Sequence, residues 1–165
     1  MWIKKEKNIP LKYDYVSDFS EELAGVLLNG KWGFINKKGK EVIPLKYDKV
    51  WDFHEELASV ELNNKWGFIG KEGKDVIPLK YDKVGDFQRG LASVKLNNKW
   101  GFIDKEGKEV IPLKYDKVWS FYNGLASVDT LILVEIKRRE KGPKYEEKEK
   151  TLGYIDKNGT EYWEE

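Results

Sequence analysis

The string Lys65-Trp66-Gly67-Phe68-Ile69 decides the fold, because it recurs at a fixed interval along the chain. Its tryptophan has counterparts at Trp32 and Trp100, each followed by Gly-Phe-Ile and each one period away (66 − 32 = 34 and 100 − 66 = 34). A second string, Pro-Leu-Lys-Tyr-Asp, keeps the same step and begins at Pro10, Pro44, Pro78 and Pro112. Self-similarity at a fixed period of this length predicts a tandem repeat protein.

The pattern inside one repeat indicates β-structure. A period of 34 residues is also that of helical tetratricopeptide repeats. Residues 91–96, however, alternate with a period near two, because Leu91, Ser93 and Lys95 interleave with smaller or apolar residues, which is typical of a strand. Asn97-Asn98 then predicts a tight hairpin turn with positive φ, and residues 99–104 form the return strand.

The rest of the repeat adds a second turn and further short strands. Residues 105–108 predict a turn in which Gly107 supplies a positive φ. Residues 109–111 predict a third strand that stops at Pro112, because proline has no N–H to give to a ladder. Residues 115–121 form a short fourth strand or an extended segment. No window long enough for a helix carries a helical stripe, so the sequence predicts an all-β fold.

The three strings that start at Lys31, Lys65 and Lys99, each followed by a glycine turn, Val-Ile-Pro and Tyr-Asp, resemble the bacterial WG-repeat (KWG) family. The resemblance covers nearly the whole chain except residues 129–151, and it implies tandem β-hairpins without a general catalytic activity. The last copy departs from the pattern, because Leu152 stands where tryptophan is expected. We expect an open, twisted β-hairpin array or solenoid. A closed propeller-like or barrel-like ring is the alternative, since the first and last copies are both partial.

The chain reads as a single repeat domain over residues 1–165. It begins with a partial copy (1–33), continues with full copies at about 34–67, 68–101 and 102–135, and closes with a partial copy (152–165). An inserted hairpin occupies about 129–151, with an apolar strand at 131–136, a turn at 141–144 and a charged return strand at 145–155. Its mixed charges favour a solvated ribbon over a nucleic-acid finger, and a protein-contact arm or an end cap stays open.

The composition limits the classes of function. Thirty Lys+Arg against 29 Asp+Glu leave a net charge of +1, so the chain has little general attraction for nucleic acid or anionic membranes. An aromatic content of 14% indicates a folded chain. The absence of cysteine removes disulfides and thiolate chemistry. No apolar run is long enough to span a bilayer and no secretory signal is visible, so the cytoplasm is the default compartment unless a leader has been removed.

Comparison of the copies with one another separates constant from variable positions. The constant aromatic residues are predicted to form the core, because a unit of 34 residues buries such groups only against its neighbours. The constant Asp14, Asp48, Asp82 and Asp116 are predicted to accept hydrogen bonds from backbone N–H groups or lysine. A repeated metal site is disfavoured, since one aspartate per repeat supplies too few ligands. The constant set, with its equivalents in the other copies, is Ile43, Pro44, Leu45, Lys46, Tyr47, Asp48, Val50, Phe53, Leu57, Ala58 and Val60, together with the Trp-Gly pair in three copies and the turn glycines Gly39, Gly73, Gly107 and Gly159.

The variable columns supply the candidate ligand contacts. One column holds Ser17, Trp51, Gly85 and Trp119. A side chain that glycine replaces in one copy is not essential to the core, so both tryptophans are expected to be partly exposed. They would then form binding anchors at the two ends of a shallow groove, with the glycine between them. Packing between repeats is the alternative for these tryptophans. Two neighbouring columns change from copy to copy and add His54, Arg89 and Tyr122.

The sequence contains no recognisable catalytic constellation. Its one histidine, His54, lies in a column that holds Ser, Gln and Tyr in the other copies, and no phosphate-binding loop is present. We therefore expect no catalytic, metal-binding or cofactor-binding residues. The predicted function is that of a non-enzymatic repeat scaffold that binds a protein or peptide partner. The alternative is a glycan or cell-envelope ligand bound through exposed aromatic residues, and nucleic acid is not an expected partner.

Overall fold

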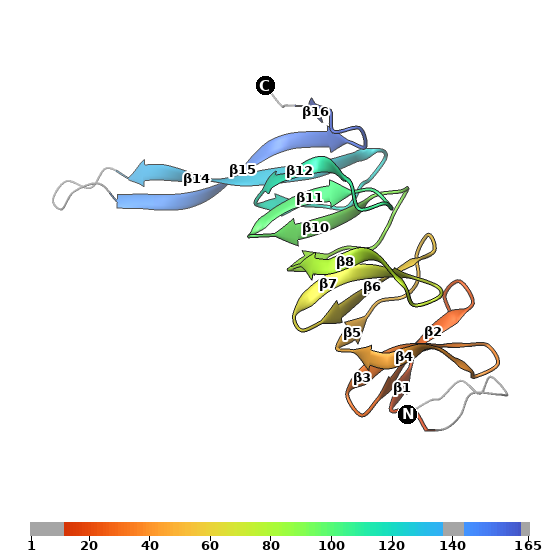
Figure 1. Ribbon diagram of the computed structural model, residues 1–165. Helices are drawn as coiled ribbons and strands as arrows, with labels where there is room; N and C mark the ends of the chain where they lie inside the picture. Colours follow the sequence, from red (N-terminus) through yellow and green to blue (C-terminus); the bar gives the residue numbers. More distant parts are fainter. Residues whose placement is uncertain (1–11, 137–143, 163–165) are drawn as a thin grey trace.

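The computed structural model describes residues 12–136 and 144–162, with the side chains of 12–129 and 153–162. Within these residues there is no helix, and four antiparallel sheets of four strands each follow one another along the chain. Figure 1 shows the sheets as an open array, with the N-terminal sheet at one end and the C-terminal sheet at the other. The predicted all-β open array is confirmed, and the alternative of a closed ring is wrong.

Each sheet is a meander, because its strand order follows the chain. The first sheet contains β1 (Tyr15–Val16), β2 (Leu23–Leu28), β3 (Lys31–Asn36) and β4 (Glu41–Tyr47). The second contains β5 (Lys49–Val50), β6 (Leu57–Leu62), β7 (Lys65–Gly70) and β8 (Asp75–Tyr81). The third contains β9 (Lys83–Val84), β10 (Ala92–Leu96), β11 (Lys99–Ile103) and β12 (Glu109–Tyr115). The fourth contains β13 (Lys117–Val118), β14 (Leu125–Ile136), β15 (Lys144–Asp156) and β16 (Glu161–Tyr162).

The tryptophan strand of each repeat belongs to a tight hairpin. In the third sheet, β10 and β11 pair up to the last residues before a two-residue turn, Leu96 opposite Lys99. Asn97 and Asn98 have φ values of 51° and 64°. Positive φ at both central residues is the requirement of a type I′ turn, which matches the twist of the flanking strands. Both predicted turns are confirmed, since Gly107 also has a positive φ, of 80°.

The expectation that the third strand of the repeat stops at Pro112 is wrong, because β12 runs through the proline to Tyr115. The pairing with β11 places Trp100 opposite Tyr115 and Phe102 opposite Ile111, so the proline lies in a bulge where the ladder is interrupted. In addition, β12 is an edge strand of its sheet. A proline without an N–H is tolerated at both kinds of position.

The bulge explains the glycine that follows each tryptophan. A Cβ atom on Gly67 would lie 2.5 Å from the carbonyl oxygen of Ile77 and 2.8 Å from the carbonyl carbon of Pro78. Both are backbone atoms of the bulged strand and have no side-chain freedom to move away. A Cβ atom on Gly33 or Gly101 would lie 2.4 Å from the carbonyl oxygen of the equivalent isoleucine, Ile43 or Ile111. The Trp-Gly and Ile-Pro strings therefore lie on two paired strands whose backbones are in close contact.

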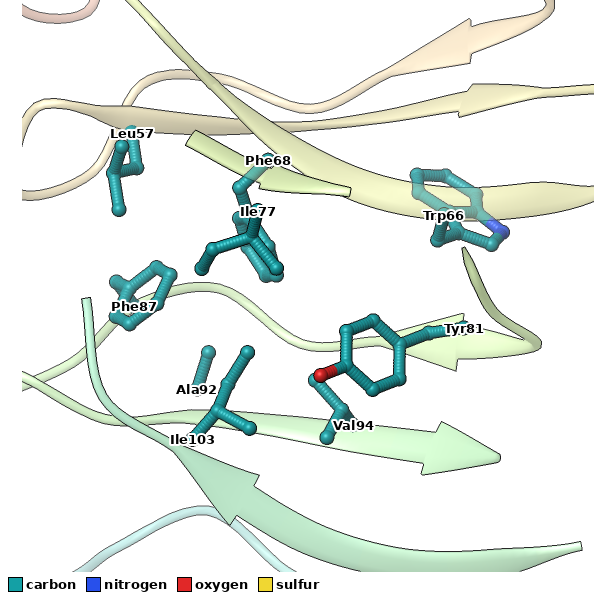
Figure 2. Packing of buried hydrophobic residues seen from close by; sticks show 9 residues of the cluster. All are labelled: Leu57, Trp66, Phe68, Ile77, Tyr81, Phe87, Ala92, Val94 and Ile103. Atoms are coloured by element: carbon teal, nitrogen blue, oxygen red, sulfur yellow. The ribbon is translucent and has the colours of Figure 1, made fainter. Parts of the chain in front are cut away.

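The hydrophobic core lies between consecutive sheets. The cluster in Figure 2 joins residues of the second sheet, among them Phe68 and Ile77, to residues of the third, among them Phe87 and Val94. The rings of Phe68 and Phe87 meet edge to face with centroids 4.8 Å apart, and equivalent pairs join the other sheets. The prediction that the constant aromatic residues form the core by stacking of neighbouring repeats is confirmed.

The constant aspartates connect the hairpin turns of neighbouring sheets. Asp82 accepts a hydrogen bond of 2.6 Å from the Lys65 ammonium, which lies beside the turn of the second sheet, and one of 2.9 Å from the backbone N–H of Asn97 in the turn of the third. The Lys65 hydrogen bond is the main cause that lowers the pKa of Asp82 below its ordinary value of 3.8. Asp48 has the same arrangement with Lys31 and Asn63. The predicted hydrogen-bonding role of these aspartates is confirmed.

The inserted hairpin extends the hairpin of the last sheet that corresponds to the tryptophan hairpins of the other sheets. The pairing of β14 with β15 continues from Leu125 opposite Asp156 to Ile136 opposite Lys144, with one register shift after Val128. Figure 1 shows this two-stranded ribbon protruding from the array. The two strands run through the region where the inserted hairpin is predicted, and most of its predicted turn at 141–144 lies outside the described residues.

We predict that Gly67→Ala lowers the free energy of unfolding by more than about 2 kcal/mol, because the new methyl group overlaps backbone atoms of the bulge. Gly70→Ala is the matched control in the same strand, since its Cβ would meet only a Val76 methyl group at 3.6 Å. Denaturant unfolding measures both variants. Equal destabilisation of the two would contradict this account of the Trp-Gly motif.

We further predict that deleting residues 131–150 and closing the gap with an Asn-Gly turn leaves the array folded. The other three hairpins close directly after the segment that packs on their neighbours. The deletion variant is expected to retain the β-sheet circular dichroism and the cooperative unfolding of the full chain. An unfolded variant would show that the ribbon is part of the stabilising structure.

Candidate functional site

A cavity with a volume of about 490 Å³ lies between the first and second sheets. Its walls are mostly apolar and aromatic, and its polar groups are Ser17, Lys49 and Asp52. The volume falls in the range of small-ligand sites in proteins. We refer to it as the first-junction cavity. The apolar and aromatic residues in its lining are Tyr15, Leu27, Trp32, Val50 and Trp51.

One wall is a row of three side chains that crosses the first sheet. Tyr15 of β1 is paired with Leu27 of β2, and Leu27 is paired with Trp32 of β3. Residues that are directly opposite in an antiparallel sheet project from the same face, so the three side chains form a continuous surface. The rings of Tyr15 and Trp32 meet edge to face with centroids 5.7 Å apart. We call this surface, and its equivalents in the other sheets, the tryptophan row.

The second sheet supplies the opposite wall. Lys49 and Val50 form the short strand β5, and Trp51 and Asp52 follow it directly. The backbone N–H of Trp51 donates to the carbonyl oxygen of Ser59, which fixes the start of this segment against its own sheet. The Trp51 side chain stays 57% exposed. An indole in such a position presents its faces to a ligand without first leaving the core.

A small residue helps to keep the cavity open. Gly25 of β2 lies on the lining, where the later copies have Ser59, Ser93 and Ser127. A Cβ at this position would already be 3.4 Å from both the Ser17 hydroxyl oxygen and a Val50 methyl group. A side chain here would therefore occupy space between the two walls.

The tryptophan rows of the next two sheets are polar. In the second sheet the row is Lys49, Glu61 and Trp66, and in the third it is Lys83, Lys95 and Trp100. The Lys49 ammonium pairs with the Glu61 carboxylate at 2.7 Å and lies 5.9 Å from the Trp66 ring centroid. Trp66 is only 8% exposed. The apolar row is thus peculiar to the first of these three sheets.

Asp52 is the charged group of the cavity that has no opposite charge bound to it. Within the described part of the chain no ion pair involves its carboxylate. Its hydrogen-bond donor is the Ser17 hydroxyl at 3.1 Å, which also lies 3.0 Å from the carbonyl oxygen of Asp18. Lys49 also lines the cavity, but its ammonium is bound to Glu61. The cavity therefore contains an uncompensated negative charge beside aromatic rings.

Both variable tryptophans are exposed, as expected from their column: 57% for Trp51 and 47% for Trp119. The structure brings Trp51 together with Tyr15 and Trp32 at the first junction. Gly85 lines a second cavity of about 200 Å³, beside Asp86, whose pKa is raised by burial. Trp119 is absent from the linings of both cavities. Ligand contact by either tryptophan stays a prediction.

The other candidates lie in a separate row of turns. His54 and Tyr122 form equivalent bridges that precede two-residue turns, and Arg89 is the first residue of such a turn, with a φ of 54°. None of the three lines the first-junction cavity. Glu21 and Glu55, which occupy the Arg89 column in earlier copies, accept backbone hydrogen bonds from the next turn, Glu56 and Gly90 respectively. This row therefore has a stacking role in the first three sheets.

Sequence reasoning missed Tyr15, Leu27 and Trp32 as site residues. The constancy of its column placed Trp32 in the predicted core, and the sequence comparison predicted no role for Tyr15 and Leu27. The signal was present in their columns, which read Tyr15, Lys49, Lys83, Lys117 and Leu27, Glu61, Lys95, Asp129. In each column a charged residue in the later copies becomes apolar in the first.

Comparison with known families agrees with the geometry. The family model of the WG-containing repeat matches four times, at residues 4–32, 32–66, 66–100 and 100–129. The chain belongs to this family, and it is a tandem repeat scaffold. No curated protein matches the sequence. Among the described residues there is no group of three or more His, Cys, Asp or Glu placed to hold a metal ion, and no helix that is long and apolar enough to cross a membrane.

We predict that Trp51→Ala lowers the free energy of unfolding by less than about 1 kcal/mol, whereas Trp66→Ala lowers it by about 3–5 kcal/mol. The reason is that Trp51 is mostly exposed and Trp66 is buried between sheets. Denaturant unfolding measures the stabilities. Acrylamide quenching of the wild type and of Trp51→Phe checks the exposure, because removal of Trp51 is expected to reduce the readily quenched fluorescence. Equal costs for the two alanine variants would place Trp51 in the core.

Proposed function

We propose that the chain is a non-enzymatic repeat scaffold that binds a protein or peptide partner, and that the first-junction cavity is the main point of contact. The observation that carries the proposal is the exposed aromatic surface of Tyr15 and Trp51 around an open cavity. In the next sheet the positions of Tyr15 and Leu27 are held by an ion-paired lysine and glutamate, Lys49 and Glu61. Exposed aromatic side chains beside a pocket are the usual anchors of protein–protein contacts.

The rigidity of the array supports a binding role. The residues that hold the two walls belong to hydrogen-bonded strands or follow them directly, and the walls are joined through the core between the first and second sheets. A preformed site loses little conformational freedom when a ligand binds, so more of the contact energy contributes to affinity.

The lining also favours binding over chemistry. Its serine hydroxyl group, that of Ser17, donates to the Asp52 carboxylate or to the Asp18 carbonyl oxygen and has no histidine beside it in the lining. In the usual serine nucleophile a histidine takes the proton of the hydroxyl group. The described lining residues provide polar contacts and aromatic surface, which are the elements of recognition.

A glycan or cell-envelope ligand is the second candidate. The observation that favours it is the combination of exposed Tyr15 and Trp51 rings with the hydrogen-bonding groups of Ser17 and Asp52. Sugar rings can stack on aromatic faces through their apolar sides, while their hydroxyl groups bind carboxylates. A peptide is the first choice, because the cavity is a compact pocket at one junction and the apolar row does not continue into the next two sheets.

The test compares the two ligand classes with the same three proteins. The wild type, Trp51→Ala and Trp119→Ala are applied to a phage-displayed library of random dodecapeptides and to a glycan array. We expect peptides that bind the wild type and Trp119→Ala alike and lose more than about tenfold in affinity for Trp51→Ala, since loss of an anchor costs 1–2 kcal/mol or more. Ligands found only on the glycan array, with the same dependence on Trp51, would support the second candidate. Trp51-independent binding, or no ligand in either format, would overturn the proposal.

A further inference from the structure

We propose that the first-junction cavity takes a cationic side chain, the ammonium of lysine or the guanidinium of arginine, held against Trp32 and the Asp52 carboxylate. The inference rests on the proposed function and narrows it, because it names the chemical class of the group that a peptide partner inserts.

The other tryptophan rows show the arrangement that the ligand would reproduce. In the second sheet the Lys49 ammonium lies 5.9 Å from the Trp66 ring centroid, and in the third sheet the Lys95 ammonium lies 5.9 Å from that of Trp100. Each lysine comes from the same row as its tryptophan. Attraction between a cation and the electron-rich face of an indole acts at these distances. Two copies of the repeat thus carry a built-in cation beside the tryptophan.

The first sheet has the tryptophan without the cation. Tyr15 stands at the position of Lys49, and Leu27 stands at the position of Lys95. In the part of the chain that the structure describes, no ammonium or guanidinium lies over the Trp32 ring. The ring is half-buried and lines the cavity, so a cation from another molecule can reach it.

The charges around the cavity select the same class of ligand. Asp52 faces the cavity, and among the described residues no ion pair involves it, whereas the charge of Lys49 is compensated by Glu61 at 2.7 Å. A cationic group in the cavity would gain a charge-assisted hydrogen bond to Asp52. An anionic group would instead meet an uncompensated carboxylate at short range. The electrostatics therefore favour a positive ligand over a negative one.

The shape of the cavity suits a long basic side chain. Leu27 and Val50 provide apolar surface for the methylene groups, while the rings of Tyr15 and Trp51 lie at the exposed edge. Lysine and arginine characteristically bury their stems on apolar surface and place the charged end on a polar group. Both parts of such a side chain find a matching partner in this cavity.

The experiment uses the full chain and two short peptides. Ac-Gly-Lys-Gly-NH2 and its uncharged counterpart with norleucine have the same aliphatic stem and differ by the ammonium group. Titrations are followed by NMR through the indole N–H signals of Trp32 and Trp51. We expect the lysine peptide to bind about tenfold more tightly than the norleucine peptide, with a similar preference for an arginine peptide.

Three variants connect that preference to the residues. Asp52→Asn is expected to reduce it to less than about threefold, because the carboxylate is replaced by an isosteric neutral group. Tyr15→Lys restores the lysine of the second sheet beside Trp32 and is expected to weaken the lysine peptide by about tenfold or more. Tyr15 is exposed, so this variant retains the fold, which denaturant unfolding verifies. Tyr162→Ala, which removes an exposed aromatic side chain outside the linings of both cavities, is the matched control and should bind as the wild type does.

The outcomes separate this inference from the proposed function. If the lysine and norleucine peptides bind equally through Trp51, the cavity is an apolar peptide site and the cationic ligand is wrong, while the proposed function stands. The same conclusion follows if neither tripeptide binds but library peptides without Lys or Arg bind through Trp51. If neither the tripeptides nor any library peptide binds, both proposals are wrong.

Discussion

The close approach of the Trp-Gly backbone to the bulged Ile-Pro strand sets the geometry of the first three sheets. At the second sheet the bulge places three residues of β8 opposite Gly67, so that Phe68 is opposite Ile77 and Trp66 is opposite Tyr81. The two extra residues are an even number, and side chains alternate with a period of two. All four large side chains therefore stay on one face, where they meet the third sheet. A residue larger than glycine would separate the strands and break this alignment.

From that contact follow the stacking of the sheets and the position of the candidate site. The pairs that flank the bulge fill the interface between sheets. Their Phe, Ile and Tyr side chains are almost fully buried, whereas the tryptophan is buried in the second sheet and partly buried in the first and third. The end of each tryptophan row away from the tryptophan lies on the first two strands of its sheet, at the rim of the interface between sheets. Lys49 stays solvent-accessible there. Changes at this rim leave the bulge and the core intact. The residues at the centre of the interface between sheets are therefore constant, whereas those at its rim vary. Tyr15, Leu27 and Trp51 are among the variable rim residues.

The sequence was sufficient for the elements whose causes are local. Asn97-Asn98 and Gly107 predict their turns, because a preference for positive φ is a property of single residues. The constant aromatic residues predict the core, because no single repeat can bury them. The proline rule failed at Pro112, because it considers the missing N–H but not the edge position and the bulge that make the N–H unnecessary. Trp51 was found from its own column. The rest of the cavity was missed, because the row of Tyr15, Leu27 and Trp32 is created by the register of three strands and cannot be read from one column.

The energetics explain how one junction can change its chemistry without cost to the fold. The Lys49–Glu61 pair joins an exposed ammonium to a shielded carboxylate, so much of its attraction offsets the desolvation of the acid. A cation beside a partly solvated indole adds about 0.5–1 kcal/mol. The first sheet replaces these terms with the edge-to-face contact of Tyr15 and Trp32, which is worth about 0.5–1.5 kcal/mol. These contributions are of similar size, but the second sheet places a lysine ammonium beside its indole, whereas among the described residues no cation lies over the Trp32 ring and no ion pair involves Asp52. Under the proposed function, the scaffold would acquire its binding site in this way, by lacking at the first junction a lysine–tryptophan contact that the second and third sheets have.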